Sequence, residues 1–181
     1  MSKLRMPVTE KDHVIGVRDA PATLVEYGDY QCSHCGFAHP LIKQLIQHFN
    51  TRLLFVFRNF PLQQSHPAAK IAAQAAEAAG LQDQFWEMHD MIYEHQEGLD
   101  ENNIRSFAER INLDIEKFMR DTESERVLSK IESDFEGGIR SGVNGTPTFF
   151  INGNRLNSYD ESYESLAAAV RKAAEAGFSE R

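Results

Sequence analysis

The chain has 181 residues, of which 41% are apolar and 25% are charged, and its formal net charge is −8. This length suits one domain with its own hydrophobic core, and no apolar run approaches the roughly 20 residues of a membrane span. A nucleic-acid partner calls for a clustered basic surface. We therefore expect a globular protein in aqueous solution, without a membrane span and without a nucleic-acid partner.

The first residues, Met1 to Val8, carry two cations but neither an apolar h-region nor a small-residue cleavage site. They do not resemble a secretory signal. As written, the chain is expected in the cytoplasm, with a periplasmic or other extracytoplasmic location if a signal was removed. The two cysteines do not decide between these compartments, because a lone Cys-x-x-Cys occurs in reducing and oxidising proteins alike.

The first half of the chain predicts a βαβ unit. Residues 22–30 follow Pro21 and are rich in β-branched and aromatic side chains, which favours a strand. Helical spacing then predicts a helix from Cys32 to about Asn50, which Pro40 should kink. The apolar run Arg52 to Phe60 suits a second strand, buried on both faces and parallel to the first. Both cysteines thus lie at the first strand-to-helix turn.

Residues 63–138 show helical patterns only. The helical segments are expected from Ser65 and Pro67 to Gly80, from about Phe85 to Gly98, after Asp100, after Asp114, and from a capping box of Thr122 and Glu125 to Gly137-Gly138. Strand character returns at 148–151, where Asn152-Gly153 predicts a hairpin. A last helix, with Ser158 and Glu161 as capping residues, should end near Gly177.

The cysteine pair indicates redox chemistry or a metal site. Cys32 lies at a helix N-terminus, where free amides and the helix dipole favour a thiolate, so we assign it as the nucleophile. Cys35, one turn inside, is assigned as the resolving thiol. The alternative is a zinc half-site of Cys32, Cys35 and His39, with His34 or His66 in reserve. Structural zinc sites need four ligands, usually from two cysteine pairs, so redox chemistry is favoured and no metal is expected.

Three neighbouring side chains are candidates to assist the pair. His34 lies between the cysteines and is expected to stabilise the thiolate, unless it is only a solvent-facing residue of the turn. Ser33 could add a hydroxyl donor. Glu26 stands in a strand otherwise built for burial, where a raised pKa would suit it to carry the proton of Cys35. The remaining histidines are expected on helix surfaces or in local hydrogen bonds.

Several blocks of sequence resemble one family in the expected order. They are Pro21 to Cys32 leading into Cys35, Arg58-Asn59-Phe60-Pro61-Leu62, His66-Pro67-Ala68-Ala69, Phe85-Trp86, and Gly145-Thr146-Pro147-Thr148 through Gly153. Together these blocks are similar to the DsbA-type thioredoxin-fold thiol:disulfide oxidoreductases, from about residue 13 to the C-terminus.

The resemblance implies an α/β fold: a thioredoxin-like domain of residues 1–62 and 139–181, with an all-helical insertion, 63–138, between its βαβ unit and its C-terminal ββα unit. It also implies that Thr146-Pro147 is the cis-proline loop that faces the cysteines and binds an extended substrate. An acidic residue occupies the place of Glu26 in the family. Two departures are Ser33, where many relatives have proline, and Thr146, where many DsbA-type oxidants have valine, so the direction of exchange stays open.

The expected function is disulfide exchange with protein or peptide thiols and disulfides. A redox partner would recycle the cysteine pair, and no bound cofactor is expected because the electrons travel in the two thiols. The alternatives are an isomerase or glutathione-linked transferase on the same scaffold, and a redox-inert peptide-binding chaperone.

Overall fold

The computed structural model describes residues 2–179, and its centre is a five-stranded mixed sheet. The strand order is β1-β3-β2-β4-β5. Strands β2 and β3 are parallel, and each of the other neighbouring pairs is antiparallel. The strands are β1 (His13–Gly16), β2 (Ala22–Gly28), β3 (Leu53–Asn59), β4 (Thr148–Ile151) and β5 (Asn154–Arg155).

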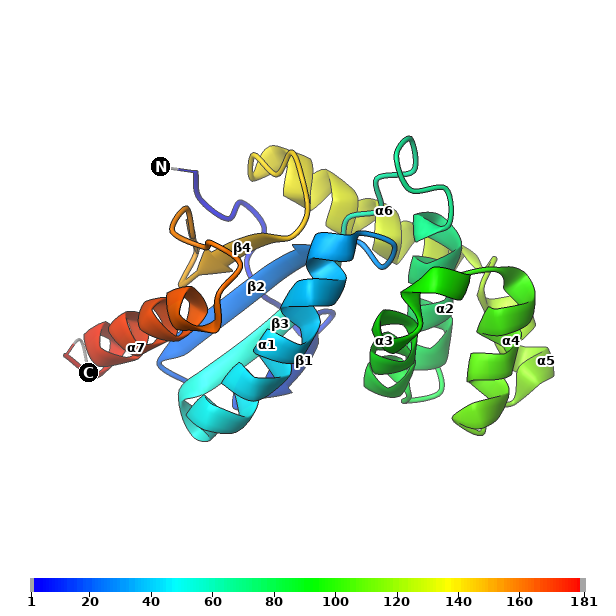
Figure 1. The fold of residues 1–181 in the computed structure, drawn as a ribbon, viewed down its shortest axis with the longest axis horizontal. Coiled ribbons are helices and arrows are strands. Elements are labelled where there is room, and N and C mark those ends of the chain that lie inside the picture. Colours follow the sequence, from blue (N-terminus) through cyan, green and yellow to red (C-terminus); the bar gives the residue numbers. More distant parts are fainter. Residues whose placement is uncertain (1, 180–181) are drawn as a thin grey trace.

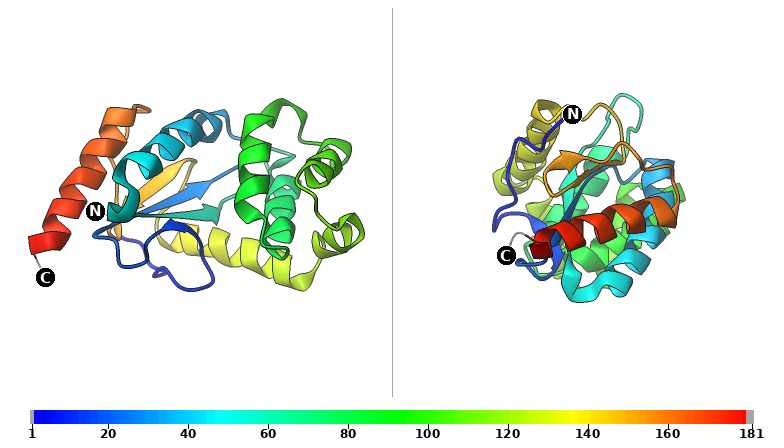
Figure 2. Two further views of the ribbon diagram at one scale, coloured as in Figure 1. Left: turned by 90° about the horizontal axis from the view of Figure 1, so that it is seen from below. Right: turned by 90° about the vertical axis from the view of Figure 1, so that its left-hand side faces the viewer.

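Helices cover both faces of this sheet, and a separate helical group lies beyond one end of it (Figure 1, Figure 2). Helices α1 and α7 lie on one face and α6 lies on the other, as the left view of Figure 2 shows. The helices are α1 (Ser33–Phe49), α2 (Ala69–Gly80), α3 (Phe85–Glu94), α4 (Glu101–Arg110), α5 (Ile115–Asp121), α6 (Glu125–Arg140) and α7 (Tyr163–Ser179), with short 3₁₀ turns η1 (Asn50–Arg52) and η2 (Gln96–Gly98).

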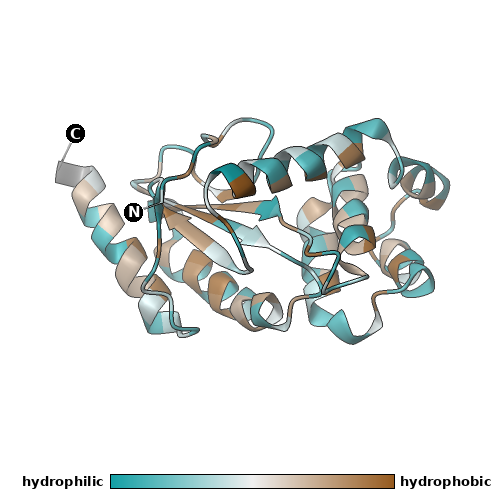
Figure 3. Ribbon diagram, turned by 90° about the horizontal axis from the view of Figure 1, so that it is seen from above, coloured by the Kyte–Doolittle hydropathy of each residue, from teal (hydrophilic) through white to brown (hydrophobic). Residues whose placement is uncertain are grey.

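The hydrophobic core has two layers, one on each face of the sheet, because successive side chains of the central strands point to opposite faces. Leu24 and Phe55 face the cluster under α1 and α7, whereas Val25 and Val56 face the cluster under α6. Successive side chains of a strand point to opposite faces, so a strand covered on both sides becomes apolar throughout. Every residue of β3 is buried, as its unbroken apolar run predicts. Figure 3 shows hydrophobic residues gathered on the strands and polar residues on the outer helix surfaces.

The insertion is built around α2, which packs against α3, α4, α5 and α6. Its small side chains allow this close approach on several sides. Seven alanines within α2 are at most 2% exposed: Ala69, Ala72, Ala73, Ala75, Ala76, Ala78 and Ala79. The alanine-rich sequence therefore serves helix packing in the interior of the insertion.

The structure confirms the predicted βαβ unit, the helical character of the insertion and the final hairpin. Cys32 is the N-cap residue of α1, which continues through Pro40 to Phe49. At the hairpin, Asn152 and Gly153 both have positive φ, 44° and 79°. A two-residue turn of this kind matches the twist of the flanking strands and favours Asn-Gly.

Three predicted helix starts were wrong. Helix α2 begins at Ala69, after a turn that contains Ser65 and Pro67, and the amide of Ala68 donates to the side chain of Gln31 instead. Ser124, not Thr122, caps α6 by accepting from the amide of Val127. At α7 the hydroxyl that accepts a first-turn amide belongs to Ser162, and it bonds Ser165. At α6 and α7 a serine directly before the helix accepts from a first-turn amide. At α2 the partner is the side chain of Gln31, which is distant in the sequence.

Gly137-Gly138 does not end α6, which runs on to Arg140. A Cβ atom on Gly138 would stand 2.7 Å from ring carbons of Phe60 and 3.1 Å from the ring of Tyr27. The glycine is therefore required for the close approach of α6 to the sheet. The sequence also does not predict β1, because a strand of only four residues at the sheet edge carries little periodic signal.

Candidate active site

Cys32 lies where β2 has ended and α1 begins. It has an extended backbone, its carbonyl accepts the first helical amide from Gly36 at 3.0 Å, and its side chain is almost fully covered. Its Sγ donates to the carbonyl oxygen of Thr146 at 3.4 Å. A hydrogen bond from the side chain of Cys35 is the main cause that lowers the pKa of Cys32 to about 5; burial opposes it, while the backbones of Cys35 and His34 add to it. This thiol is set up to ionise.

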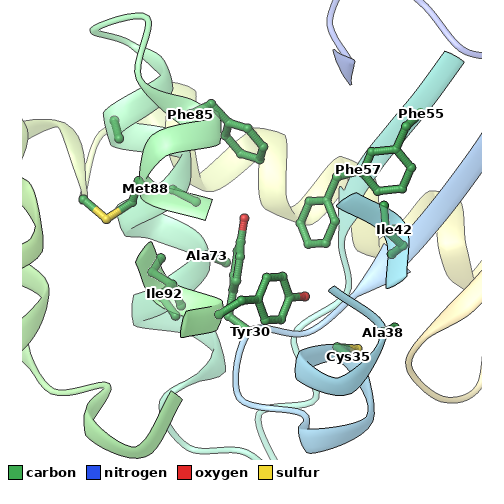
Figure 4. Close-up of a cluster of buried hydrophobic side chains, with 14 of the residues drawn as sticks. Tyr30, Cys35, Ala38, Ile42, Phe55, Phe57, Ala73, Phe85, Met88 and Ile92 are labelled. Carbon is green, nitrogen blue, oxygen red and sulfur yellow. The ribbon is translucent and has the colours of Figure 1, made fainter. Parts of the chain in front are cut away.

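Cys35 has the opposite environment. It is fully buried one turn inside α1, and Figure 4 shows it beside Ala38 in the apolar cluster that contains Tyr30. The amide of Asp29 donates to its Sγ at 3.5 Å. Burial raises the pKa of Cys35 well above its usual range, and the neighbouring Cys32 and Glu26 act in the same direction. Of the two sulfurs, only Cys32 is therefore an anion near neutral pH.

Glu26 lies in β2 and is 2% exposed. Burial raises its pKa to about 8, and the negative charge on Cys32 adds to this effect. Its Oε1 has no hydrogen-bond partner among residues 2–179. A buried carboxyl without partners is costly to ionise. Glu26 is therefore a protonated acid near neutral pH, close enough to both cysteines to interact electrostatically with them.

His34 and Ser33 both point into solvent. The imidazole of His34 is 63% exposed and pairs with the carboxylate of Glu161, in the loop before α7. That hydrogen bond and charge raise the pKa of His34, with a further contribution from Cys32. Ser33 is exposed in the first turn of α1. The backbone of His34 adds a hydrogen bond that lowers the pKa of Cys32, and the largest contribution to this lowering comes from Cys35.

Thr146 and Pro147 form the loop that leads into β4, and the peptide bond between them is cis. Both residues are partly exposed. The carbonyl of Thr146 is the oxygen in contact with Cys32, whereas its Oγ1 is buried and has no hydrogen-bond partner within the described chain. The structure thus brings this loop against the cysteine turn, 114 residues away in the sequence.

Gln96 is a site residue that sequence reasoning missed. From η2 in the insertion, its Nε2 donates to the carbonyls of Tyr30 and Cys32, at 2.8 and 2.9 Å. A side chain on Gly36 would collide with Gln96, so the two fit against each other. On the other side of the turn, Asp29 accepts from the amides of Gln31 and Leu62. The insertion therefore helps to hold the cysteine turn, and no local pattern in the sequence signals it.

Contrary to the prediction from the sequence, the remaining histidines do not all lie on helix surfaces or make local hydrogen bonds. His13 and His66 lie outside the helices and bond Glu77 and Asp29, which are distant in the sequence, and two others are buried. His39 and His89 are 6% and 3% exposed. Their rings pack edge to face between α1 and α3, and both also contact Tyr93. An imidazole among aromatic rings can fill a core position, and helical spacing alone does not distinguish this from a surface position.

Strand order, helical insertion and a dithiol at the N-terminus of α1 define a thioredoxin-fold protein of the DsbA type. The family model described as thioredoxin matches residues 8–172. The chain belongs to this thioredoxin family.

Solved structures agree with this assignment. A thioredoxin-like oxidoreductase from Silicibacter pomeroyi DSS-3 is 25% identical, with a TM-score of 0.82 over 92% of this chain and 94% of that one. BdbD from Bacillus subtilis, in its oxidised form, is 23% identical with a TM-score of 0.83, over 96% and 98% of the two chains. The fold of this chain is thus that of thiol–disulfide oxidoreductases, and the chain carries a Cys-x-x-Cys pair at Cys32 and Cys35.

Sequence relatives bear a different name. A protein from Salinispora arenicola named Na(+)/H(+) antiporter NhaA 1 is 45% identical over 172 residues, which is 94% of this chain but 26% of that protein. The chain therefore spans about a quarter of the length of this curated relative. Among the helices of residues 2–179, none has the length and hydrophobicity needed to cross a bilayer.

Proposed function

We propose that the protein exchanges disulfides with protein or peptide substrates through Cys32 and Cys35. The observation that carries the proposal is the difference between the two thiols: the pKa of Cys32 is lowered to about 5, whereas burial raises that of Cys35. Thiolates, not thiols, attack disulfides, and a thiol of low pKa is also the better leaving group. Cys32 is therefore the sulfur that joins the substrate.

In the oxidising direction a substrate thiolate attacks the sulfur of Cys32 in the Cys32–Cys35 disulfide. The new bond is a mixed disulfide, and Cys35 departs as a thiolate. A second substrate thiolate then attacks the substrate sulfur of the mixed disulfide and expels Cys32, so that the substrate is oxidised and the pair is reduced by two electrons. The reducing direction is the reverse, in which Cys35 resolves the mixed disulfide that Cys32 has formed.

We further propose that Glu26 exchanges a proton with Cys35. The departing thiolate of Cys35 is buried and must be protonated, and in the reverse step its thiol must lose that proton. A carboxyl whose pKa is about 8 can do both near neutral pH. His34 has an auxiliary role, in which its imidazolium stabilises the thiolate of Cys32.

The substrate segment is proposed to lie along the loop of Thr146 and Pro147. Both residues are partly exposed beside Cys32, where an extended chain can add main-chain hydrogen bonds. Phe37, on the same face of α1 as Ser33, is 58% exposed. A large exposed apolar side chain near a reactive thiol suits a polypeptide substrate better than a small polar one.

The direction proposed is oxidation, because a thiolate stabilised in the folded protein favours the reduced form and makes the disulfide a stronger oxidant. Equilibration against a glutathione series would then give a potential nearer to about −120 mV than to about −270 mV. A potential of about −270 mV would contradict the proposed oxidising direction but would not contradict disulfide exchange through Cys32 and Cys35.

Two variants test the exchange itself. We expect Cys32→Ser to abolish turnover of a dithiol peptide, and Cys35→Ser to accumulate a mixed disulfide visible by mass spectrometry. Ser33→Ala, which changes the neighbouring exposed hydroxyl, is the matched control and retains activity. Full turnover by Cys32→Ser contradicts the mechanism.

A further inference from the structure

Three side chains with metal-binding atoms meet between α1 and α3. His39 comes from α1, and His89 and Asp90 come from α3; one possible ligand atom of each lies within 4.8 Å of the other two. The imidazoles are buried, whereas the carboxylate of Asp90 is 37% exposed. Figure 4 shows the two helices on either side of Tyr30. Two imidazoles and one carboxylate are therefore grouped near the protein surface, with Asp90 on the solvent side.

His39 supplies a second observation that points to a ligand. Its Nε2 is buried and has no hydrogen-bond partner in the described part of the chain, although it lies 3.3 Å from Oδ1 of Asp90. The ring nitrogen does not point along the line to that oxygen. Two ligand atoms bound to one tetrahedral zinc ion at about 2.05 Å stand roughly 3.3 Å apart, and each points at the ion rather than at the other. The spacing and the missing hydrogen bond both fit a shared ion.

The groups around the cluster keep it ready to bind a cation. The hydroxyl of Tyr30 lies 2.8 Å from Nδ1 of His89 and orients that ring. Partners of this kind normally support metal-binding histidines. Lys43 holds the other carboxylate oxygen of Asp90 at 2.6 Å, and its positive charge opposes a bound cation.

We propose that His39, His89 and Asp90 form a binding site for a divalent transition-metal ion, Zn²⁺ in the first place. Imidazole and carboxylate are ligands that Zn²⁺ prefers, and three protein ligands leave a fourth position for water. The site is distinct from the cysteine-based zinc half-site considered from the sequence, although His39 belongs to both sets. It is independent of the disulfide-exchange proposal.

The test must first remove the cysteines as competing ligands. Zn²⁺ is titrated calorimetrically into the full chain carrying Cys32→Ser and Cys35→Ser. One ion per chain is expected. In that background Asp90→Asn and His89→Gln should each weaken binding by more than about tenfold, since loss of even a supporting contact costs about that much. His48→Gln, which changes an exposed histidine of α1 outside the cluster, is the matched control and leaves the affinity unchanged.

Lys43→Met supplies a readout that a misfolded variant cannot imitate. Removing the ammonium frees the second oxygen of Asp90, so binding should become tighter, while far-ultraviolet circular dichroism verifies the fold of every variant. Co²⁺ in place of Zn²⁺ should give the strong visible absorption of a four-coordinate ion without thiolate charge-transfer bands. The proposal is overturned if the cysteine-free chain binds no Zn²⁺ at one equivalent, or if Asp90→Asn and His89→Gln bind as well as their parent.

Discussion

The carboxylate of Glu161 pairs with the imidazole of His34, although 127 residues separate them in the sequence. Glu161 has a positive φ of 65° in the loop before α7, and its side chain reaches the first turn of α1. The pair lies in solvent beside Cys32. A residue expected to cap α7 thus belongs instead to the surroundings of the thiolate.

Replacing Glu161 by Gln should lower the pKa of His34, because the hydrogen bond and the negative charge of Glu161 are the main causes that raise it. The imidazole proton resonances of His34 followed against pH by NMR measure this. The effect on exchange rates should stay within about fivefold, since the pair is exposed and screened. Glu164→Gln, at an exposed carboxylate of α7, is the control; equal pKa values for His34 in the two variants would refute the assignment.

The low pKa of Cys32 should depend on Cys35. In the reduced protein, absorbance of the thiolate near 240 nm should titrate with a midpoint of about 5. Cys35→Ala removes the largest cause of the lowering and should move the midpoint upward. Ser33→Ala should leave it unchanged, because other groups supply the hydrogen bonds to Cys32. A shift in Ser33→Ala as large as that in Cys35→Ala would show that the hydroxyl of Ser33 stabilises the thiolate.

Glu26→Gln should stabilise the reduced protein at neutral pH. Burial is the largest cause that raises the pKa of Glu26 in the folded protein above its value in the unfolded chain. As the pH rises, the unfolded state therefore loses this proton first. The free energy of unfolding falls between about pH 4.5 and about pH 8. A neutral amide removes that loss, which is on the order of 3 kcal/mol at pH 7. Denaturant unfolding at pH 7 and pH 4 measures it. The gain should vanish at pH 4, where both states are protonated; an equal gain at both values excludes the titration of Glu26 as its cause.

The same variant should slow the resolving step. Without a group to carry the proton of Cys35, decay of a preformed mixed disulfide should fall by about 100-fold. Stopped-flow fluorescence with a labelled peptide follows this step, and formation of the mixed disulfide at Cys32 provides the internal control because it needs no proton from Cys35. If the mixed disulfide decays as fast in Glu26→Gln as in the unchanged protein, Glu26 does not carry the proton of Cys35.

Two adjacent glycines of α6 should respond differently to alanine. A Cβ on Gly138 meets the rings of Phe60 and Tyr27, so Gly138→Ala should destabilise the fold by about 1–3 kcal/mol. At Gly137 the closest atom, 3.1 Å away, belongs to the flexible side chain of Met6. There the helix propensity of alanine should compensate, and Gly137→Ala should be near neutral or stabilising. Thermal unfolding measures the stability of both variants. An equal loss of stability in Gly138→Ala and Gly137→Ala would contradict the packing described for α6.

Prediction from the sequence succeeded where the signal is local. The apolar run that forms β3, the Asn152-Gly153 turn and the position of Cys32 at the start of α1 each depend on residues that are neighbours in the chain. It failed where a distant partner replaces a local one. The amide of Ala68 bonds Gln31, and Gly138 lies inside α6 at a point where a side chain would collide with Phe60. Propensity describes the chain alone, and such contacts override it.

The sequence by itself determined the order of the elements from β2 onward, the helical nature of the insertion and the two thiols at a strand-to-helix turn, because periodicity and spacing are properties of short segments. Only the tertiary structure decided what surrounds those thiols. The sheet order and the packing of the insertion bring Thr146, Gln96 and Glu161 to the cysteine turn. They also bring His39 to His89 and Asp90. Such long-range contacts depend on how whole helices and strands pack together, which no local sequence pattern encodes.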